Sequence, residues 1–185
     1  MSKLNIIILI VVLVVVFICL CIILFKYFSD KLSNIIDKLN DAENEAFEKL
    51  KCKHELLTKL IKNVESKYKI ESKVFEDVNS MEITDLSSFK NEKVLNKCYR
   101  EIIQIKEDNR KQKETKTLKE LLSNYDENEL HIISLRTFHN KYTLIYNNLI
   151  KKFPYNIISK IKRYGIKTLI EGKELNTNYN NDLEV

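Results

Sequence analysis

The sequence predicts an all-α protein in which a transmembrane helix is followed by an antiparallel up-and-down helical bundle. Three observations support this fold class. The only proline is Pro154 and no glycine precedes Gly165, so most of the chain lacks the residues that most readily interrupt a helix. Residues 6–25 carry no charge. Beyond them, apolar residues recur at steps of three and four, which is the period of one helix face.

Residues 6–25 read IIILIVVLVVVFICLCIILF and lie between Lys3 and Lys26. As a helix they span roughly 30 Å, the thickness of the hydrocarbon core of a bilayer. A cleaved signal peptide is the alternative, but its apolar region is usually shorter and ends at small residues. Here Phe25-Lys26-Tyr27-Phe28 follows instead. We therefore expect residues 1–28 to be a retained membrane anchor.

The first amphipathic stripe begins at Leu32 and ends at Val78. It predicts one helix, about 70 Å long, which continues from the anchor if nothing interrupts it. The segment 79–91 is the first cluster of capping and turn residues, so we expect the chain to reverse there.

A second stripe covers 95–103, and the polar segment 107–117 predicts a connection. A third stripe covers 118–153. Within it, Asp126-Glu127-Asn128-Glu129 has the spacing of a capping box, which leaves open whether the helix continues, kinks or restarts there.

Pro154 ends this pattern, because the residue before a proline avoids the α region. A short amphipathic helix is expected over 156–164, and residues 171–185 read as a flexible polar tail.

The amphipathic helices of residues 29–170 bury their apolar faces most simply as an antiparallel bundle. A parallel coiled-coil dimer is the alternative. Phe, Tyr, Ile, Leu and Ala are mixed along the stripes rather than sorted into a and d positions, which favours the bundle over the coiled coil.

The net charge of +5 does not indicate nucleic-acid binding, because Lys alternates with acidic residues along most of the chain. This is typical of a solvated surface. Residues 151–170 are the exception, with six Lys or Arg and no acid, and such a segment near a membrane could contact anionic headgroups. Lys26, Lys31 and Lys38 outnumber Lys3, which favours a cytoplasmic bundle, although a large domain can cross the membrane regardless.

The sequence contains no recognisable reaction centre. Without glycines in the body of the domain there is no phosphate loop, nucleophile elbow or dinucleotide fingerprint. His54, His131 and His139 read as surface or rim histidines, and Glu43 as an exposed helix-surface charge. A hydrolase site built from His131, His139 and nearby carboxylates is the enzyme alternative. We expect no catalytic residue, cofactor or metal.

Two further features leave alternatives open. Cys52 and Cys98 are expected to be two reduced thiols, and a single disulfide between them is the alternative. Arg136, Asn140, Thr143 and Asn147 form a polar row beside the apolar face of the last long helix. Their side chains are either half-buried, with hydrogen bonds to a neighbouring helix or to the segment after Pro154, or solvated.

The segment LRTFHNKYTLIYNNLIKKFPYNIIS, residues 135–159, resembles the end of the last bundle helix in the LemA family. Seven positions carry the resemblance: Arg136, Asn140, Tyr146, Asn147, Phe153, Pro154 and Asn156. Residues 49–64 are similar to the family's first bundle helix, and the anchor lies at the expected place before it. The chain departs from the family pattern at Thr58, Leu130 and His139 and in having no Trp.

The resemblance implies a single-pass protein of the bacterial cell membrane with a four-helix bundle in a bromodomain-like arrangement. It carries over no catalytic residue, so the seven positions are expected to be structural. The leading hypothesis is a non-enzymatic module that binds another membrane or envelope protein, besides the lipid bilayer itself. Self-assembly through the long first helix is the alternative, and a role as accessory to a membrane protease is a further one.

Overall fold

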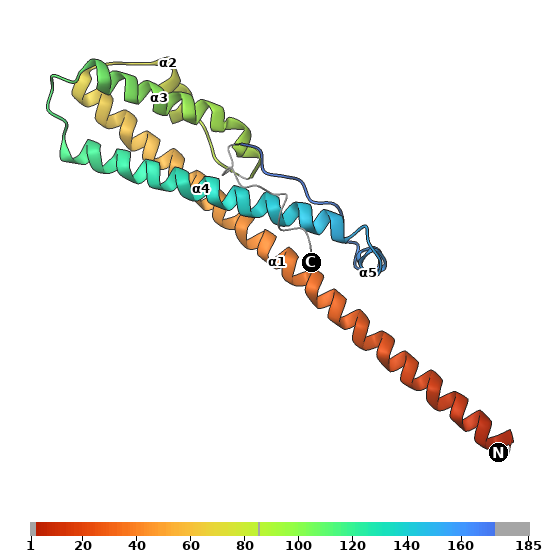
Figure 1. Cartoon of the computed structure of the whole chain (residues 1–185). Coiled ribbons are helices and arrows are strands. Elements are labelled where there is room, and N and C mark those ends of the chain that lie inside the picture. The colour runs from red at the N-terminus through yellow and green to blue at the C-terminus, as the bar shows by residue number, and fades with distance from the viewer. Residues whose placement is uncertain (1–2, 85, 173–185) are drawn as a thin grey trace. The chain divides into compact units, whose positions relative to one another are not determined.

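The computed structural model describes residues 3–84 and 86–172, and every regular element in these ranges is helical (Figure 1). The all-α prediction is therefore confirmed. Five α-helices and one 3₁₀ helix follow one another in this part of the chain: α1 (Lys3–Tyr68), α2 (Lys73–Asn79), η1 (Leu86–Asn91), α3 (Glu92–Asp108), α4 (Lys116–Leu149) and α5 (Tyr155–Lys162). The four-helix, bromodomain-like arrangement stays a prediction.

The chain divides into two compact units. The anchor unit comprises Met1–Leu39 and Tyr142–Thr168, and the helical unit comprises Asn40–Lys141 and Leu169–Val185. Helices α1 and α4 contribute residues to both units. Of the predicted polar tail, residues 173–185 lie outside the described residues.

The anchor unit contains the apolar first part of α1. This part is long and apolar enough to cross a membrane, and its large apolar side chains from Leu4 to Phe25 are all exposed. Those exposed side chains suit a lipid environment. Farther along α1, a small core joins it to the end of α4 and to α5: Leu32, Leu39, Tyr146, Ile150, Tyr155 and Ile158.

The helical unit is built from the later part of α1, from α2 and α3, and from most of α4. Its core contains fully buried side chains from each helix, among them Leu57, Phe75, Ile102 and Ile132. Helix α3 begins directly after η1 and ends at the polar connection that the sequence predicted, with α4 starting at Lys116. There the side chain of Thr115 accepts a hydrogen bond from the N–H of Leu118, which satisfies one free donor of the first turn.

The prediction of one continuous helix from Leu32 to Val78 is wrong between residues 69 and 72. Helix α1 ends at Tyr68, and Lys69 takes a left-handed conformation with φ of 54°. Ser72 then begins α2 as its N-cap, because its side chain accepts a hydrogen bond from the N–H of Val74. Phe75 is buried on α2, so the apolar spacing persists across a break that the spacing cannot reveal.

The capping-box pattern at residues 126–129 marks no break, because α4 runs through it. These side chains contact other helices instead. Asp126 accepts a hydrogen bond from the hydroxyl of Tyr99, and Asn128 donates one to the carbonyl of Lys49.

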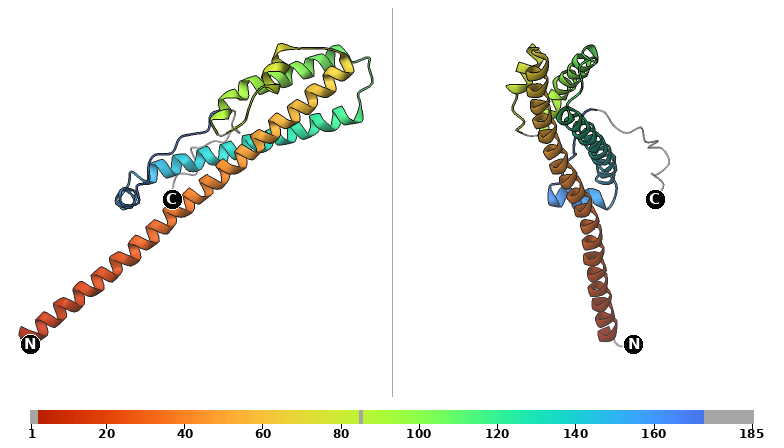
Figure 2. Two further views of the ribbon diagram at one scale, coloured as in Figure 1. Left: turned by 180° about the vertical axis from the view of Figure 1, so that it is seen from behind. Right: turned by 90° about the vertical axis from the view of Figure 1, so that its left-hand side faces the viewer.

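The prediction that the helix ends before Pro154 is confirmed, but the end comes four residues before Phe153, where the predicted stripe finished. Helix α4 ends at Leu149, the Phe153–Pro154 peptide bond is cis, and α5 begins at Tyr155. Figure 2 shows that α5 crosses α1 within the anchor unit instead of running along it.

Candidate functional site

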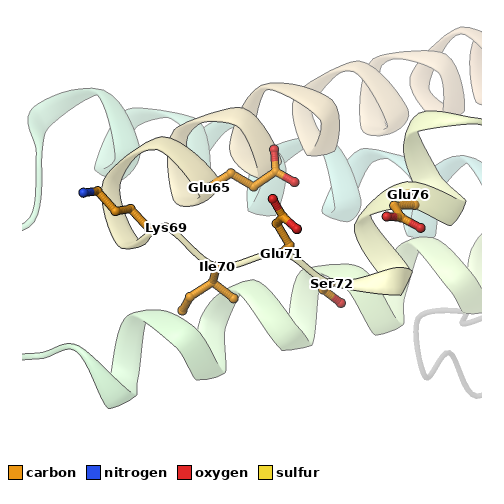
Figure 3. Close-up of a pocket in the computed structure, with 6 residues that line it drawn as sticks. All are labelled: Glu65, Lys69, Ile70, Glu71, Ser72 and Glu76. Atoms are coloured by element: carbon orange, nitrogen blue, oxygen red, sulfur yellow. The ribbon is translucent and has the colours of Figure 1, made fainter.

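The described surface of the helical unit includes two hollows that are candidates, since concave surfaces are the first place to look for a site. The larger, about 430 Å³, lies where α1 ends and is lined by Glu65, Lys69, Ile70, Glu71, Ser72 and Glu76. In Figure 3 the carboxylates of Glu65 and Glu71 turn toward one another, whereas Lys69 extends away. The hollow is acidic, but no group of residues in the described part of the chain is placed to hold a metal ion.

The smaller hollow, about 260 Å³, lies between α1 and α4. We call it the α1/α4 hollow, and it is lined by Lys49, Cys52, Leu56, Asn124, Glu127, Asn128 and His131. Asn128 is 6% exposed, and its Nδ2 donates to the carbonyl of Lys49 at 2.9 Å. Its Oδ1 is buried and accepts no hydrogen bond from any described residue. Asn128 therefore has a buried, unsatisfied acceptor, which is rare inside proteins.

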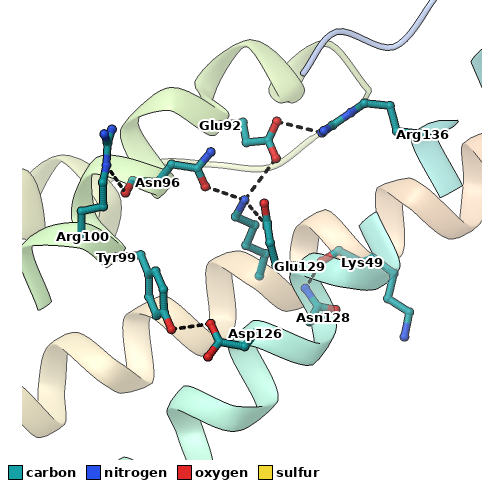
Figure 4. Close-up of polar contacts among 10 residues, drawn as sticks. Lys49, Glu92, Asn96, Tyr99, Arg100, Asp126, Asn128, Glu129 and Arg136 are labelled. Carbon is teal, nitrogen blue, oxygen red and sulfur yellow. Dashed lines mark hydrogen bonds and ion pairs between the residues drawn. The ribbon is translucent and has the colours of Figure 1, made fainter. Parts of the chain in front are cut away.

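A third feature of the helical unit is a buried cluster of charges that connects α1, α3 and α4. Lys53 on α1 is fully buried. Its ammonium lies 3.1 Å from Glu92, 2.8 Å from Asn96 and 2.6 Å from Glu129. Figure 4 shows these three acceptors converging from two different helices. All three donors of the lysine are thus used inside the protein.

Glu92 joins this lysine to a second buried cation. Its other carboxylate oxygen accepts a hydrogen bond from Arg136 at 2.8 Å, and Arg136 is fully buried (Figure 4). The guanidinium lies over the ring of Phe89, 5.2 Å from its centroid. The cluster of Lys53, Glu92, Asn96, Glu129 and Arg136, called the charge cluster below, has two cations and two carboxylates that neutralise one another.

The backbone of Gly172 packs closely against the Arg136 side chain of the charge cluster. Its φ of +131° is one that side-chain-bearing residues rarely adopt, and an added Cβ would lie 2.5 Å from the Arg136 guanidinium carbon. A glycine is therefore required here. Because the Arg136 side chain is covered in this way, it is not available to a substrate.

Sequence reasoning found Arg136 but missed Lys53, Glu92 and Glu129. A signal for Lys53 was present, since it follows Leu50 by three residues and precedes Leu57 by four, which places it on the buried stripe. A lysine at such a position is rarely buried unless it is paired. The identity of its partners depends on how the helices pack, which the spacing does not determine.

The polar row of α4 is used to hold the segment after α5. Asn147 donates to the carbonyl of Lys167 at 2.8 Å and accepts from its N–H at 2.9 Å. Asn140 does the same with Ile170, at 2.9 and 2.8 Å. Each amide thus binds one backbone residue on both sides, as a neighbouring strand would. The first reading of the row is confirmed for these two amides, which bind the segment after Pro154. Thr143 is fully buried, and its Oγ1 has no hydrogen-bond partner among the described residues.

The remaining family positions extend this arrangement. Tyr146 donates its hydroxyl hydrogen bond to the carbonyl of Gly165 at 2.8 Å, and burial raises the pKa of this phenol, so it stays a neutral donor. Pro154 and Asn156 lie at the turn into α5 and are half-buried. Phe153 differs from the others, because 78% of it is exposed. The segment 164–171 is held by Asn140, Tyr146 and Asn147 through these hydrogen bonds, and we call it the strap.

The expectation that His139 is a surface histidine is wrong, as is the exposed position expected for Glu43. His139 is 1% exposed, and its Nε2 lies 3.0 Å from a carboxylate oxygen of Glu43 on α1. Its Nδ1 lies 3.1 Å from Oδ1 of Asn140. His139 therefore belongs to the helix packing of the helical unit, which helix spacing alone did not distinguish from the rim.

The other two histidines do not complete a reaction centre with it. His131 is exposed and lines the α1/α4 hollow. It is eight residues from His139, about 12 Å along the helix axis. His54 is half-buried, with Nε2 2.8 Å from the carbonyl of Val78. The structure does not bring together the His131 and His139 site considered from the sequence.

Cys52 and Cys98 are free thiols, so the structure contains no bridge between them. Cys98 is fully buried in the core. Burial, with a smaller contribution from the charge of Glu101, raises its pKa to about 12. It is therefore an inert thiol at neutral pH.

The chain matches the model of a known protein family. The family model described as the LemA family matches residues 42–181. This range includes the charge cluster, the polar row and the strap. No curated protein and no solved structure matches the chain.

Proposed function

Because the chain belongs to the LemA family, we propose that it is a non-enzymatic, membrane-anchored helical module that binds another membrane or envelope protein. The observation that supports this most is that polar side chains of the family motif are hydrogen-bonded within the chain. Arg136, Asn140, Tyr146 and Asn147 all direct their polar groups to partners within the chain. Side chains engaged in this way shape a surface instead of reacting with a substrate.

A catalytic group must reach the reacting atoms of a substrate within hydrogen-bond distance. Arg136 and Asn140 are at most 2% exposed, and Glu92 and Lys53 neutralise each other. The motif therefore contributes to function through rigidity. A rigid surface favours binding, because little order has to be imposed on it when a partner arrives.

The α1/α4 hollow is the part of this surface that we propose as the contact. It is a concave surface between two helices, and its lining includes the exposed polar side chains of Asn124, Glu127 and His131, which a partner can reach. Exposed Leu130 lies beside it on α4, with 62% of its surface open. An exposed apolar side chain next to a concave, partly polar surface can serve as an anchor at a protein interface.

Site-specific photo-cross-linking in the cells that make the protein tests this function. A benzophenone amino acid at His131, inside the hollow, is expected to give one defined adduct with a second protein. The same amino acid at Lys97, which is exposed on α3 and lines neither hollow, is the matched control and is expected to give none.

A second substitution connects the adduct to the hollow. Glu127→Lys reverses a charge in its lining and is expected to abolish the adduct, whereas Glu120→Lys on the same helix is expected to keep it. An adduct between two copies of this chain would favour self-assembly instead. Equal adducts at His131 and Lys97, or none at either, would contradict the proposal.

A further inference from the structure

Helix α5 has a second apolar side that no described residue covers. Ile157 and Ile161 are 47% and 63% exposed, and being four residues apart they share one side of the helix. Phe153, just before α5, is 78% exposed. Tyr155 and Ile158 are buried on the opposite side, in the core of the anchor unit.

The contact between α5 and α1 places this side at the end of the apolar run. The ring of Tyr155 packs edge-on against Phe28, with 5.2 Å between the centroids. Phe28 is three residues beyond Phe25, or about 4.5 Å along the helix axis. A helix with its side chains is about 10 Å across. If residues 6–25 span the hydrocarbon core, α5 therefore lies at the boundary between acyl chains and headgroups.

The orientation of α5 within the anchor unit agrees with that position. In the right-hand view of Figure 2, α5 lies across α1. If α1 crosses a bilayer, a helix that lies across it runs in the plane of the membrane surface. This is the usual orientation of an interfacial amphipathic helix.

Charge is distributed unequally between the two units. The anchor unit contains ten Lys or Arg residues but two acidic residues, Asp30 and Asp37, both on α1. The whole chain has a net charge of +5, so the rest of the chain is net negative. Four exposed lysines lie on α5 or shortly before it: Lys151, Lys152, Lys160 and Lys162. Basic residues concentrated next to a membrane-spanning helix are suited to anionic lipid.

We propose that α5 is an interfacial helix that binds an anionic lipid surface, with Phe153, Ile157 and Ile161 inserted among the headgroups and the four lysines beside the lipid phosphates. The inference rests on the proposal that α1 spans the membrane, and it is independent of the protein partner. We favour lipid over an acidic protein because the apolar side of α5 lies at the end of the membrane-spanning run, where the bilayer surface is within reach. The helix gives the chain a second attachment close to the anchor.

Tryptophan fluorescence tests the insertion, because the chain has no native Trp. Ile161→Trp reports on the open side of α5 and Tyr27→Trp on the end of the anchor. Leu130→Trp on the helical unit is the matched control, since Leu130 and Ile161 are 62% and 63% exposed. Each full-length variant is reconstituted into vesicles of phosphatidylcholine and phosphatidylglycerol, with bromine atoms on the acyl chains near the headgroups.

Bromolipid is expected to quench Ile161→Trp and Tyr27→Trp to a similar extent and to leave Leu130→Trp nearly unchanged. Quenching of Tyr27→Trp without Ile161→Trp would overturn the inference and leave the anchor in place. In that case an acidic protein would be the better candidate to bind the basic residues of α5. If Tyr27→Trp is not quenched, the membrane-spanning α1 fails and the inference fails with it.

A charge variant tests the preference for anionic lipid. Replacing Lys151, Lys152, Lys160 and Lys162 by Gln in the Ile161→Trp chain is expected to weaken insertion by up to about fivefold per lysine. The matched control replaces four exposed lysines of the helical unit by Gln: Lys93, Lys97, Lys111 and Lys119. Equal quenching in all three chains, or equal quenching in vesicles without phosphatidylglycerol, would overturn the anionic preference.

Discussion

At the scale of single residues, Glu92 has the most consequential position in the helical unit. It is 5% exposed and contacts both buried cations, Lys53 and Arg136. Burying charges costs free energy that only close pairing offsets. We therefore expect the charge cluster to matter for the uniqueness of the packing, because helices in another register would leave two cations unpaired.

Glu92→Gln is expected to lower the free energy of unfolding by about 3–5 kcal/mol, because it leaves two buried cations with one carboxylate. For a chain of this size that is a fall of roughly 10 °C in the thermal unfolding midpoint, measured by circular dichroism in detergent. Glu48→Gln, which breaks the exposed pair with Lys51, is the control and should change it by less than about 1 kcal/mol. Equal midpoints for both variants would contradict the role of the charge cluster.

The buried thiol of Cys98 leads to a second prediction at this scale. With its pKa raised to about 12 by burial, the reactive thiolate is rare at pH 8, and each pKa unit changes its fraction roughly tenfold. In a chain whose other three cysteines are Ala, maleimide is expected to label Cys98 at least about a thousandfold more slowly in the folded than in the unfolded state. Rates within tenfold of each other would show that the thiol is accessible.

At the scale of elements, the strap depends on amides of α4. Asn147→Leu removes the side-chain donor and acceptor that bind the backbone of Lys167, and it keeps a similar side-chain volume. The cost is expected to be about 1–2 kcal/mol, seen as a lower thermal midpoint. Asn148→Leu, one residue further along and exposed, is the control and should leave the midpoint unchanged. If Asn147→Leu unfolds at the same or a higher temperature, the asparagine does not hold the strap.

The sequence predicted the helical elements well where composition changes along the chain. The apolar run, the polar connection before Lys116 and the stop at Pro154 are each marked by residue type. The break at residues 69–72 is not marked, because Lys69 takes the left-handed conformation without being Gly or Asn. Apolar spacing also continues through Phe75, so the pattern favours one long helix.

The candidate site was harder to predict, because it depends on which helices face each other. The spacing placed Arg136 and Asn140 beside the apolar face of α4 and left their partners open. Glu92 and Glu129 come from other parts of the sequence and meet Lys53 only in the folded helical unit. His139 and Glu43 form a similar case, since single-helix spacing does not reveal that they face each other.

At the scale of the whole molecule, net positive charge and exposed apolar surface are concentrated in the same unit of the chain. The apolar run, all of the net positive charge and α5 belong to the anchor unit, whereas the rest of the chain is net negative and contains the two hollows described above. This division suits a protein that is attached to a membrane by one unit and meets a partner through the other.

The side of the membrane that faces the helical unit is also testable. Lysines following the apolar run favour the cytoplasm. Cys98 is too deeply buried to report it, so the test uses Ser123→Cys, an exposed position on α4, in a chain with all four native cysteines replaced. Labelling by a membrane-impermeant maleimide is expected only after the cells are opened. Labelling of intact cells would place the helical unit outside.

The central claim is that the family motif shapes and holds the surface instead of carrying out a reaction. Amide hydrogen exchange over the full chain in detergent tests it most directly. The N–H groups of Lys167 and Ile170 are expected to be protected, because they donate to Asn147 and Asn140. Those of Ile166 and Leu169, which have no acceptor among the described residues, should exchange fast. Asn147→Leu should remove the protection at Lys167 and keep that at Ile170, whereas exchange at one common rate along the strap would contradict the account.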